Sequence, residues 1–117
     1  MKSLCVFYMP NYNKGKIYMI YSTDSPVLLP YYGSTTKSLN RRLSKHKDHF
    51  KRWKQGKMSN CSSFKLLEQG FDKVAIILVE DYPCNSKQEL EIREAHYIKN
   101  NPCINMNLPS GIVAESL

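Results

Sequence analysis

The sequence predicts a small α+β domain in which helices pack against a short sheet. Short runs rich in Ile, Val and Tyr, typical of strands, share the chain with two longer stretches whose apolar residues recur at helical spacing. The order along the chain is hairpin, helix, helix, strand, helix. Because the strands are too few and too interrupted for a doubly wound parallel sheet, we expect a small α+β sandwich.

The first two strands are expected to form a hairpin. Residues 16–22, KIYMIYS, alternate between faces and are rich in Ile and Tyr. The breaker sequence TDSP follows, and residues 27–33, VLLPYYG, return as the second strand. Residues 33–36 then read as a turn, with Ser38 or Thr36 as the expected N-cap of the next helix.

Two helices and a third strand are expected in the middle of the chain. Residues 39–55 form an amphipathic pattern that ends before Gly56, with apolar positions at Leu39, Leu43, Phe50 and Trp53. Residues 63–69 read as a short helix that Gly70 ends. Residues 74–79, VAIILV, are continuously apolar, which predicts a strand covered on both faces.

The last predicted helix, residues 86–101, carries a carboxylate on its apolar side. Ser86 and Glu89 form a capping box, and Asn-Asn-Pro ends the pattern. At about 100° per residue, Glu94 falls within the stripe formed by Leu90, Tyr97 and Ile98. Such a carboxylate either is neutralised by an ion pair or serves as a ligand for a hard cation such as Mg²⁺.

The positive charge of the chain is concentrated in one segment. The 117 residues carry a net charge of +7 and show no linker or internal repeat, so we expect a single domain over residues 1–117. Between residues 37 and 57, nine Lys and Arg residues stand against the single acid Asp48. A charged run can be a solvated helix face, but an excess gathered on one element indicates a polyanionic partner, most commonly nucleic acid.

Several classes of protein are disfavoured by the composition. No run approaches the roughly 20 apolar residues of a membrane span, and the N-terminal residues lack the features of a signal peptide. The four cysteines are widely scattered without a Cys-x-x-Cys pair, which favours free thiols over disulfides or a zinc site. We therefore expect a protein that works inside the cell, without a membrane partner.

Polar residues of two predicted elements are candidates for phosphate chemistry. On the first helix, Arg42 and His46 lie one turn apart at the edge of the apolar stripe, where Arg can engage a phosphate and His can transfer a proton. The hairpin contributes tyrosines on both strands, among them Tyr18 and Tyr31. Strand tyrosines are commonly packing residues, and a phenol becomes a useful base only where nearby cations lower its pKa.

Five segments of the chain, taken together, resemble the GIY-YIG nuclease family. They are KIY, YYG, LNRRLSKH, REAHYI and CINMNLP, which follow the order of the family motifs and span residues 16–109. The resemblance implies a three-stranded antiparallel sheet flanked by helices and a divalent-metal-dependent cleavage of DNA phosphodiesters. The chain departs from the family pattern at Lys16, where the motif has Gly, and at Tyr32, where it has Ile.

The resemblance also assigns individual residues. Tyr18 and Tyr31 match the two motif tyrosines, and Glu94 matches the single metal-binding glutamate. His46 matches a position that the family fills with His or Tyr. Arg42 matches the motif arginine, with Arg41 as its rival, and Asn105 matches the asparagine near the end of the domain, with Asn107 as a less favoured register.

The resemblance implies hydrolysis of a phosphodiester at one Mg²⁺ or Mn²⁺ ion bound by Glu94. Arg42 would neutralise charge on the phosphate, with Tyr18 as the general base and His46 as proton relay or alternative base. Tyr31 would position phosphate or water, and Asn105 would orient the helix of Glu94 or a neighbouring group.

The basic helix is expected to hold DNA through its phosphates. The expected contacts are Lys37, Arg41, Lys45, Lys51, Arg52 and Lys54, which bind the backbone without reading bases. The alternative to an enzyme is a non-cleaving DNA-binding module that uses the same helix, residues 39–55. Glu94 favours the enzyme, because a carboxylate opposes the charge of DNA and a mere binder does not need it.

Overall fold

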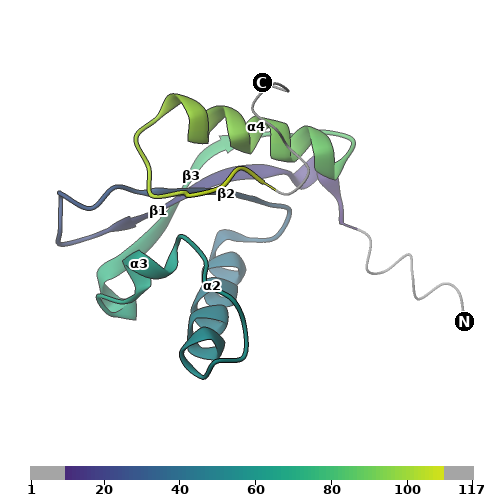
Figure 1. The fold of residues 1–117 in the computed structure, drawn as a ribbon. Coiled ribbons are helices and arrows are strands. Elements are labelled where there is room, and N and C mark those ends of the chain that lie inside the picture. Colours follow the sequence, from purple (N-terminus) through teal and green to yellow (C-terminus); the bar gives the residue numbers. More distant parts are fainter. Residues whose placement is uncertain (1–9, 110–117) are drawn as a thin grey trace, which may run out of the picture.

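The computed structural model describes residues 10–109, which form a three-stranded antiparallel sheet with helices on both faces (Figure 1). Helix α4 covers one face, and α2 and α3 lie on the other. The strands stand in the order β2-β1-β3, so β1 is central and both neighbours are edge strands. The elements are η1 (Tyr12–Lys14), β1 (Lys16–Ser22), β2 (Tyr31–Thr35), α2 (Leu39–Lys54), α3 (Phe64–Leu67), η2 (Phe71–Lys73), β3 (Val74–Asp81) and α4 (Lys87–Asn100). The predicted α+β class with a three-stranded antiparallel sheet is confirmed.

The second strand begins and ends later than the sequence predicts. Two prolines flank residues 27–29, and a proline cannot donate a backbone hydrogen bond to a neighbouring strand. Val27 is accordingly 85% exposed and lies in a turn. The strand instead runs through Gly33, which pairs with Tyr18, and on to Thr35, which pairs with Lys16. The expected turn at residues 33–36 is therefore wrong, and the error matters because Gly33 lies inside the sheet.

The prediction that β3 is covered on both faces is also wrong. Ile77 and Leu78 are 46% and 41% exposed. Among the described residues the strand pairs with β1 alone, and its register shifts between the partners of Ile17 and Tyr18. A continuous apolar run thus occurs here in an edge strand of an antiparallel sheet, which is not the parallel arrangement in which such runs are usual.

The helices match the prediction more closely. Ser38 caps α2, and its side chain accepts a hydrogen bond from the Arg41 backbone. Ser86 caps α4 by accepting from the Glu89 backbone. Helix α3 is shorter than expected, with only four residues. The described cysteines Cys61, Cys84 and Cys103 are free, as expected, while Cys5 lies outside the described residues.

The core lies between the sheet and α2, and aromatic side chains dominate it. Phe50 packs against Trp53, Phe64 and Phe71 with ring centroids 5.6–5.7 Å apart. The interpretation of Trp53 as a core residue is thereby confirmed. Because α2 is anchored through these rings, the polar residues in its first half are held against β1.

Polar contacts hold α4 on the opposite face. Arg93 donates two hydrogen bonds to Glu80 of β3, at 2.7 and 3.1 Å, and Tyr97 donates a third to the same carboxylate at 3.0 Å. Tyr97 also stacks on Tyr32 of β2, with the ring centroids 5.8 Å apart. One helix is thus tied to both edge strands. This fixes the position of Glu94, one residue after Arg93.

Candidate active site

The position of Tyr18 depends on the absence of a side chain at Gly33. The two residues are direct partners in the pairing of β1 with β2. A Cβ atom at Gly33 would overlap the Cζ and Oη atoms of the Tyr18 ring. The backbone at Gly33 does not have a positive φ, so the glycine is needed for space and not for conformation. The ring therefore lies across β2, and its hydroxyl reaches over the edge strand.

The Tyr18 hydroxyl is buried between two side chains of α2. Arg42 Nε donates to it at 2.9 Å, and His46 Nε2 lies 2.8 Å away. Burial raises the pKa of Tyr18 to about 12, although Arg42 lowers it by charge and by hydrogen bonding. In the free protein Tyr18 is thus a neutral phenol. In the metal-free protein Arg42 alone does not favour the phenolate, because desolvation outweighs its effect on the pKa of Tyr18.

His46 is neutral and has a polar partner on each ring nitrogen. Burial, followed by the positive charge of Arg42, lowers its pKa to about 3. Its Nδ1 atom lies 2.9 Å from the hydroxyl of Ser63, just before α3. Nothing in the sequence marks Ser63, which reads only as the first residue of the short helix expected at residues 63–69. A neutral imidazole next to Tyr18 can accept a proton.

Tyr31 and Tyr32 point to opposite faces of β2. Tyr31 packs its ring against the edge of His46, with centroids 5.3 Å apart. Tyr32 packs against α4. Burial raises the pKa of Tyr31 well above its usual range. The described part of the chain offers the Tyr31 hydroxyl no hydrogen bond, so this hydroxyl is available to a ligand.

Glu94 points from α4 toward the edge of β2, where Ser34 donates a hydrogen bond to it at 2.5 Å. Burial raises the pKa of Glu94 to about 7, although the Ser34 hydroxyl acts in the opposite direction. Within residues 10–109 the ion pair that involves α4 joins Arg93 to Glu80 of β3, and Glu94 has no ion-pair partner there. The interpretation of Glu94 as a neutralised ion-pair partner is therefore wrong. Ser34, like Ser63, was not found by sequence reasoning, since a Ser next to Gly is a common turn signal.

One pocket of about 380 Å³ brings these groups together. It wraps around the edge of β2, so residues from both faces of the sheet line it. Among them are Tyr18, Tyr31, Ser34, Arg42 and Glu94. The edge strand explains how a glutamate from α4 can meet an arginine from α2 although the sheet separates the two helices.

Residues 14–105 match the family model described as the GIY-YIG catalytic domain. The chain belongs to the GIY-YIG family. No curated protein and no solved structure matches the chain in the corresponding comparisons. Membership of this family makes the protein a nuclease, which hydrolyses phosphodiesters of DNA. GIY-YIG nucleases generally depend on a divalent metal. No helix within residues 10–109 is long and apolar enough to cross a membrane.

The asparagine near the end of the GIY-YIG domain contacts the edge strand and not the helix of Glu94. Asn105 donates from Nδ2 to the Tyr32 carbonyl at 2.8 Å and accepts the Tyr32 N–H at 2.9 Å. Next to it, the Ile104 N–H donates to the Pro30 carbonyl. The segment thus satisfies the free edge of β2 beside Tyr31. The alternative residue Asn107 is exposed.

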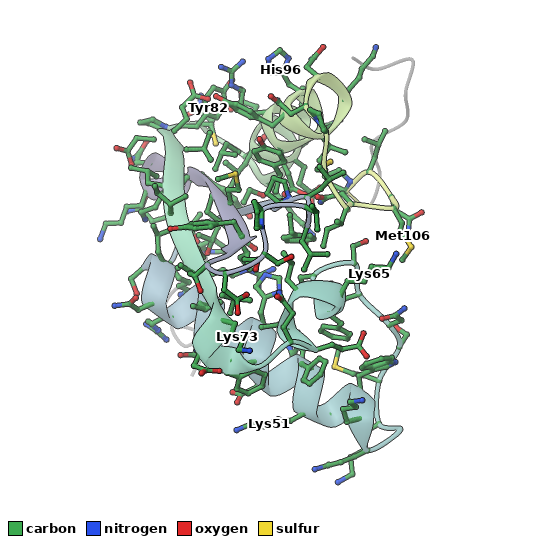
Figure 2. All side chains as sticks on the ribbon, turned by 90° about the vertical axis from the view of Figure 1, so that its left-hand side faces the viewer. Lys51, Lys65, Lys73, Tyr82, His96 and Met106 are labelled. Atoms are coloured by element: carbon green, nitrogen blue, oxygen red, sulfur yellow. The ribbon has the colours of Figure 1, made fainter. Side chains whose placement is uncertain are left out.

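A basic groove lies along α2 and adjoins the pocket that Tyr18 and Glu94 line. Thr35 and Arg42 line both hollows. Of the predicted phosphate contacts, five line the groove: Lys37, Arg41, Lys45, Lys51 and Arg52. Lys54 lies apart, with its ammonium over the rings of Phe50 and Trp53. Figure 2 shows Lys51 projecting from α2 at the opposite end of the molecule from His96.

The residues present fit a single divalent ion. Within residues 10–109, no group of three His, Cys, Asp or Glu side chains is placed to hold a metal. Glu94 is a half-buried carboxylate that lines the pocket and whose one side-chain hydrogen bond comes from a neutral hydroxyl. This donor set suits a hard ion that keeps most of its water and takes further oxygens from the substrate phosphate. It does not suit zinc, which needs several nitrogen or sulfur ligands.

The raised pKa of Glu94 predicts a pH-dependent effect of its replacement. The folded protein holds this proton more tightly than the unfolded chain, so the contribution of Glu94 to stability falls as pH rises from its usual value toward about 7. In Glu94→Gln this loss is absent. Thermal unfolding in EDTA should therefore show the variant gaining stability relative to wild type between about pH 5 and about pH 8. A difference in stability between Glu94→Gln and wild type that does not change with pH would contradict the raised pKa of Glu94.

Proposed function

We propose that this nuclease is an endonuclease that hydrolyses DNA phosphodiesters with one Mg²⁺ or Mn²⁺ ion, and that residues 1–117 form one catalytic domain. The observation that carries the proposal is the buried hydroxyl of Tyr18 between Arg42 and His46, in a pocket that Glu94 also lines. This arrangement supplies a route for a proton, a fixed positive charge and a cation ligand within one small space. An intracellular location is in keeping with the free thiols of the described cysteines.

The proton route begins at the attacking water. Tyr18 takes a proton from the water and passes its own hydroxyl proton to Nε2 of His46, 2.8 Å away. In this way Tyr18 acts as the base without becoming a phenolate beforehand, which its pKa of about 12 would oppose. The negative phosphate of bound DNA raises the proton affinity of His46, because opposite charges favour its protonated form. His46 thus serves as relay, and Tyr18 is the group that touches water.

Arg42 would neutralise charge on the phosphate. Its Nε bonds to Tyr18, and its guanidinium has further N–H groups to offer to a phosphate oxygen in the pocket. Arg41 is exposed on the groove, which favours Arg42 for this role. Tyr31 presents to the same phosphate or to the water a hydroxyl that has no hydrogen-bond partner among residues 10–109. Asn105 holds the β2 backbone next to Tyr31 and so acts by positioning it.

Glu94 would hold the divalent ion, whose chemistry is to polarise the scissile phosphoryl group and stabilise the leaving oxygen. Glu94 also argues against the alternative of a DNA-binding module that does not cleave. Burying a carboxylate among groups that face DNA weakens binding and costs desolvation. A module that only binds gains nothing from it.

Cleavage of supercoiled plasmid tests the proposed function. The wild-type protein should nick or linearise the plasmid in Mg²⁺, and EDTA should stop the reaction. Glu94→Gln should abolish cleavage while DNA binding holds or improves, because a negative charge near the phosphate is removed. Retained cleavage by the variant would exclude Glu94 as the ligand. Binding of the plasmid by the wild type without any cleavage would favour the alternative module.

Three tyrosine variants distinguish chemistry from packing. Replacement by Phe keeps the ring and removes only the hydroxyl. Tyr18→Phe should lower the cleavage rate by about 10²-fold or more, the usual effect of losing a general base. Tyr31→Phe loses a positioning hydrogen bond and should be less affected. Tyr32→Phe is the matched control, because its ring faces α4, and should cleave normally. Equal rates for all three variants would leave the tyrosines with a packing role.

The basic groove predicts a salt-dependent affinity. Each phosphate neutralised should add roughly 0.9 to the slope of log affinity against log salt. Replacing Lys45 and Arg52 with Glu should weaken binding and flatten this slope, because both line the groove. Lys99→Glu, in the last turn of α4, which lies across the sheet from α2, is the matched control. A slope unchanged by the double replacement would place the DNA elsewhere.

A further inference from the structure

Ser63 occupies a helix-capping position without capping the helix. It directly precedes α3, where a serine side chain normally accepts a backbone N–H. Here the backbone of Ser63 is already helical, and its hydroxyl makes no capping bond. The residue is nonetheless fully buried, with 0% of its surface exposed. A buried hydroxyl needs a partner, and that of Ser63 has two: Nδ1 of His46 at 2.9 Å and, as a weaker contact, Sγ of Cys61 at 3.5 Å.

The hydrogen bonds around Tyr18 determine which nitrogen of His46 carries the proton. Arg42 has no acceptor atom, so its Nε–H must point at the oxygen of Tyr18. Tyr18 is fully buried, so its hydroxyl proton needs an acceptor in the protein. Among residues 10–109 that acceptor is His46 Nε2, 2.8 Å away, and the proton therefore points there. A neutral imidazole has one N–H, which must therefore lie on Nδ1 and point at Ser63.

We infer that Ser63 is a positioning residue that holds His46 in the Nδ1–H form, so that Nε2 stays free to receive the proton of Tyr18. The catalytic part of this inference rests on the proposed function, while the tautomer itself does not. With the opposite tautomer, Nε2 would carry a hydrogen toward Tyr18 and the relay would be blocked. Ser63 thus acts on the reaction through His46 and touches neither water nor phosphate.

The neutral character of Ser63 also suits a relay. When Tyr18 transfers its proton, the imidazolium formed has an N–H on each nitrogen, and the Ser63 oxygen accepts the one on Nδ1. A hydroxyl does not bind this cation as strongly as a carboxylate would. After the transfer, Tyr18 holds the proton taken from the water and is again a neutral phenol. Once the products leave, Tyr18 releases that proton to solvent and His46 returns the proton on Nε2 to the Tyr18 oxygen, which restores the starting state.

Two isosteric variants test the inference. Ser63→Thr keeps a hydroxyl, and Ser63→Val has the shape of threonine without a hydroxyl. Any strain from the atoms added to serine is therefore the same in both variants. Ring ¹⁵N spectra of the metal-free protein report the tautomer, and a His46→Gln variant identifies the signals of His46. Wild type and Ser63→Thr should show Nδ1 protonated and Nε2 bare, whereas Ser63→Val should show a mixture. In plasmid cleavage, Ser63→Val should lose about three- to tenfold in kcat relative to Ser63→Thr, with KM unchanged.

The ¹⁵N spectra and the cleavage rates can each contradict the inference separately. A single Nδ1–H tautomer in Ser63→Val would overturn the role of Ser63 even if the protein cleaves DNA well. Equal kcat for Thr and Val would overturn its part in catalysis. If the wild type cleaves nothing, the proposed function fails, yet the spectra still decide the tautomer. Should the larger side chains prevent folding, Ser63→Ala against wild type provides the same comparison.

Discussion

The contact between the Tyr18 ring and Gly33 is the constraint on which the catalytic pocket depends. Tyr18 belongs to the central strand, where side chains on the adjacent strands ordinarily keep a ring from extending across the sheet. Because Gly33 has no side chain, the ring lies across the edge strand and its hydroxyl meets Arg42 and His46 of α2. Any side chain at Gly33 would push the hydroxyl away from both partners. The absence of a side chain at one residue thus determines where the Tyr18 hydroxyl lies.

The second determinant is that β2 is an edge strand. A sheet normally separates the residues on its two faces, yet the pocket joins Arg42 from one face with Glu94 from the other. This is possible only at the rim of the sheet. A free strand edge exposes unpaired backbone groups, and here the side chain of Asn105 satisfies those of Tyr32. The edge is thereby protected without a fourth strand that would close the pocket.

Burial sets the charge of the free site. It raises the pKa of Tyr18 and of Glu94 and lowers that of His46, so each shift favours the neutral form of the group. Arg42 is the exception, because a guanidinium keeps its charge in proteins. The pocket therefore presents a positive charge to an incoming phosphate, and the adjoining groove adds the cations of α2. The carboxylate becomes available in full only above about pH 7 or when a cation displaces its proton.

The sequence by itself determined the class of fold and the family. Helical periodicity and capping residues located α2 and α4, because these signals are local. The spacing of Arg42 and His46 and the placement of Glu94 in an apolar stripe also survive in the structure. Each depends only on the geometry of a single helix, which any reader of the sequence can compute.

Only the tertiary structure decided the rest. The extent of β2 and the exposure of β3 depend on which strand lies beside which, and local sequence carries no record of that. Ser34 and Ser63 were missed for the same reason. A lone serine has no periodic signal, and its partners Glu94 and His46 are distant in the chain. The pKa shifts, finally, follow from burial, a property that exists only once the chain has packed around these groups.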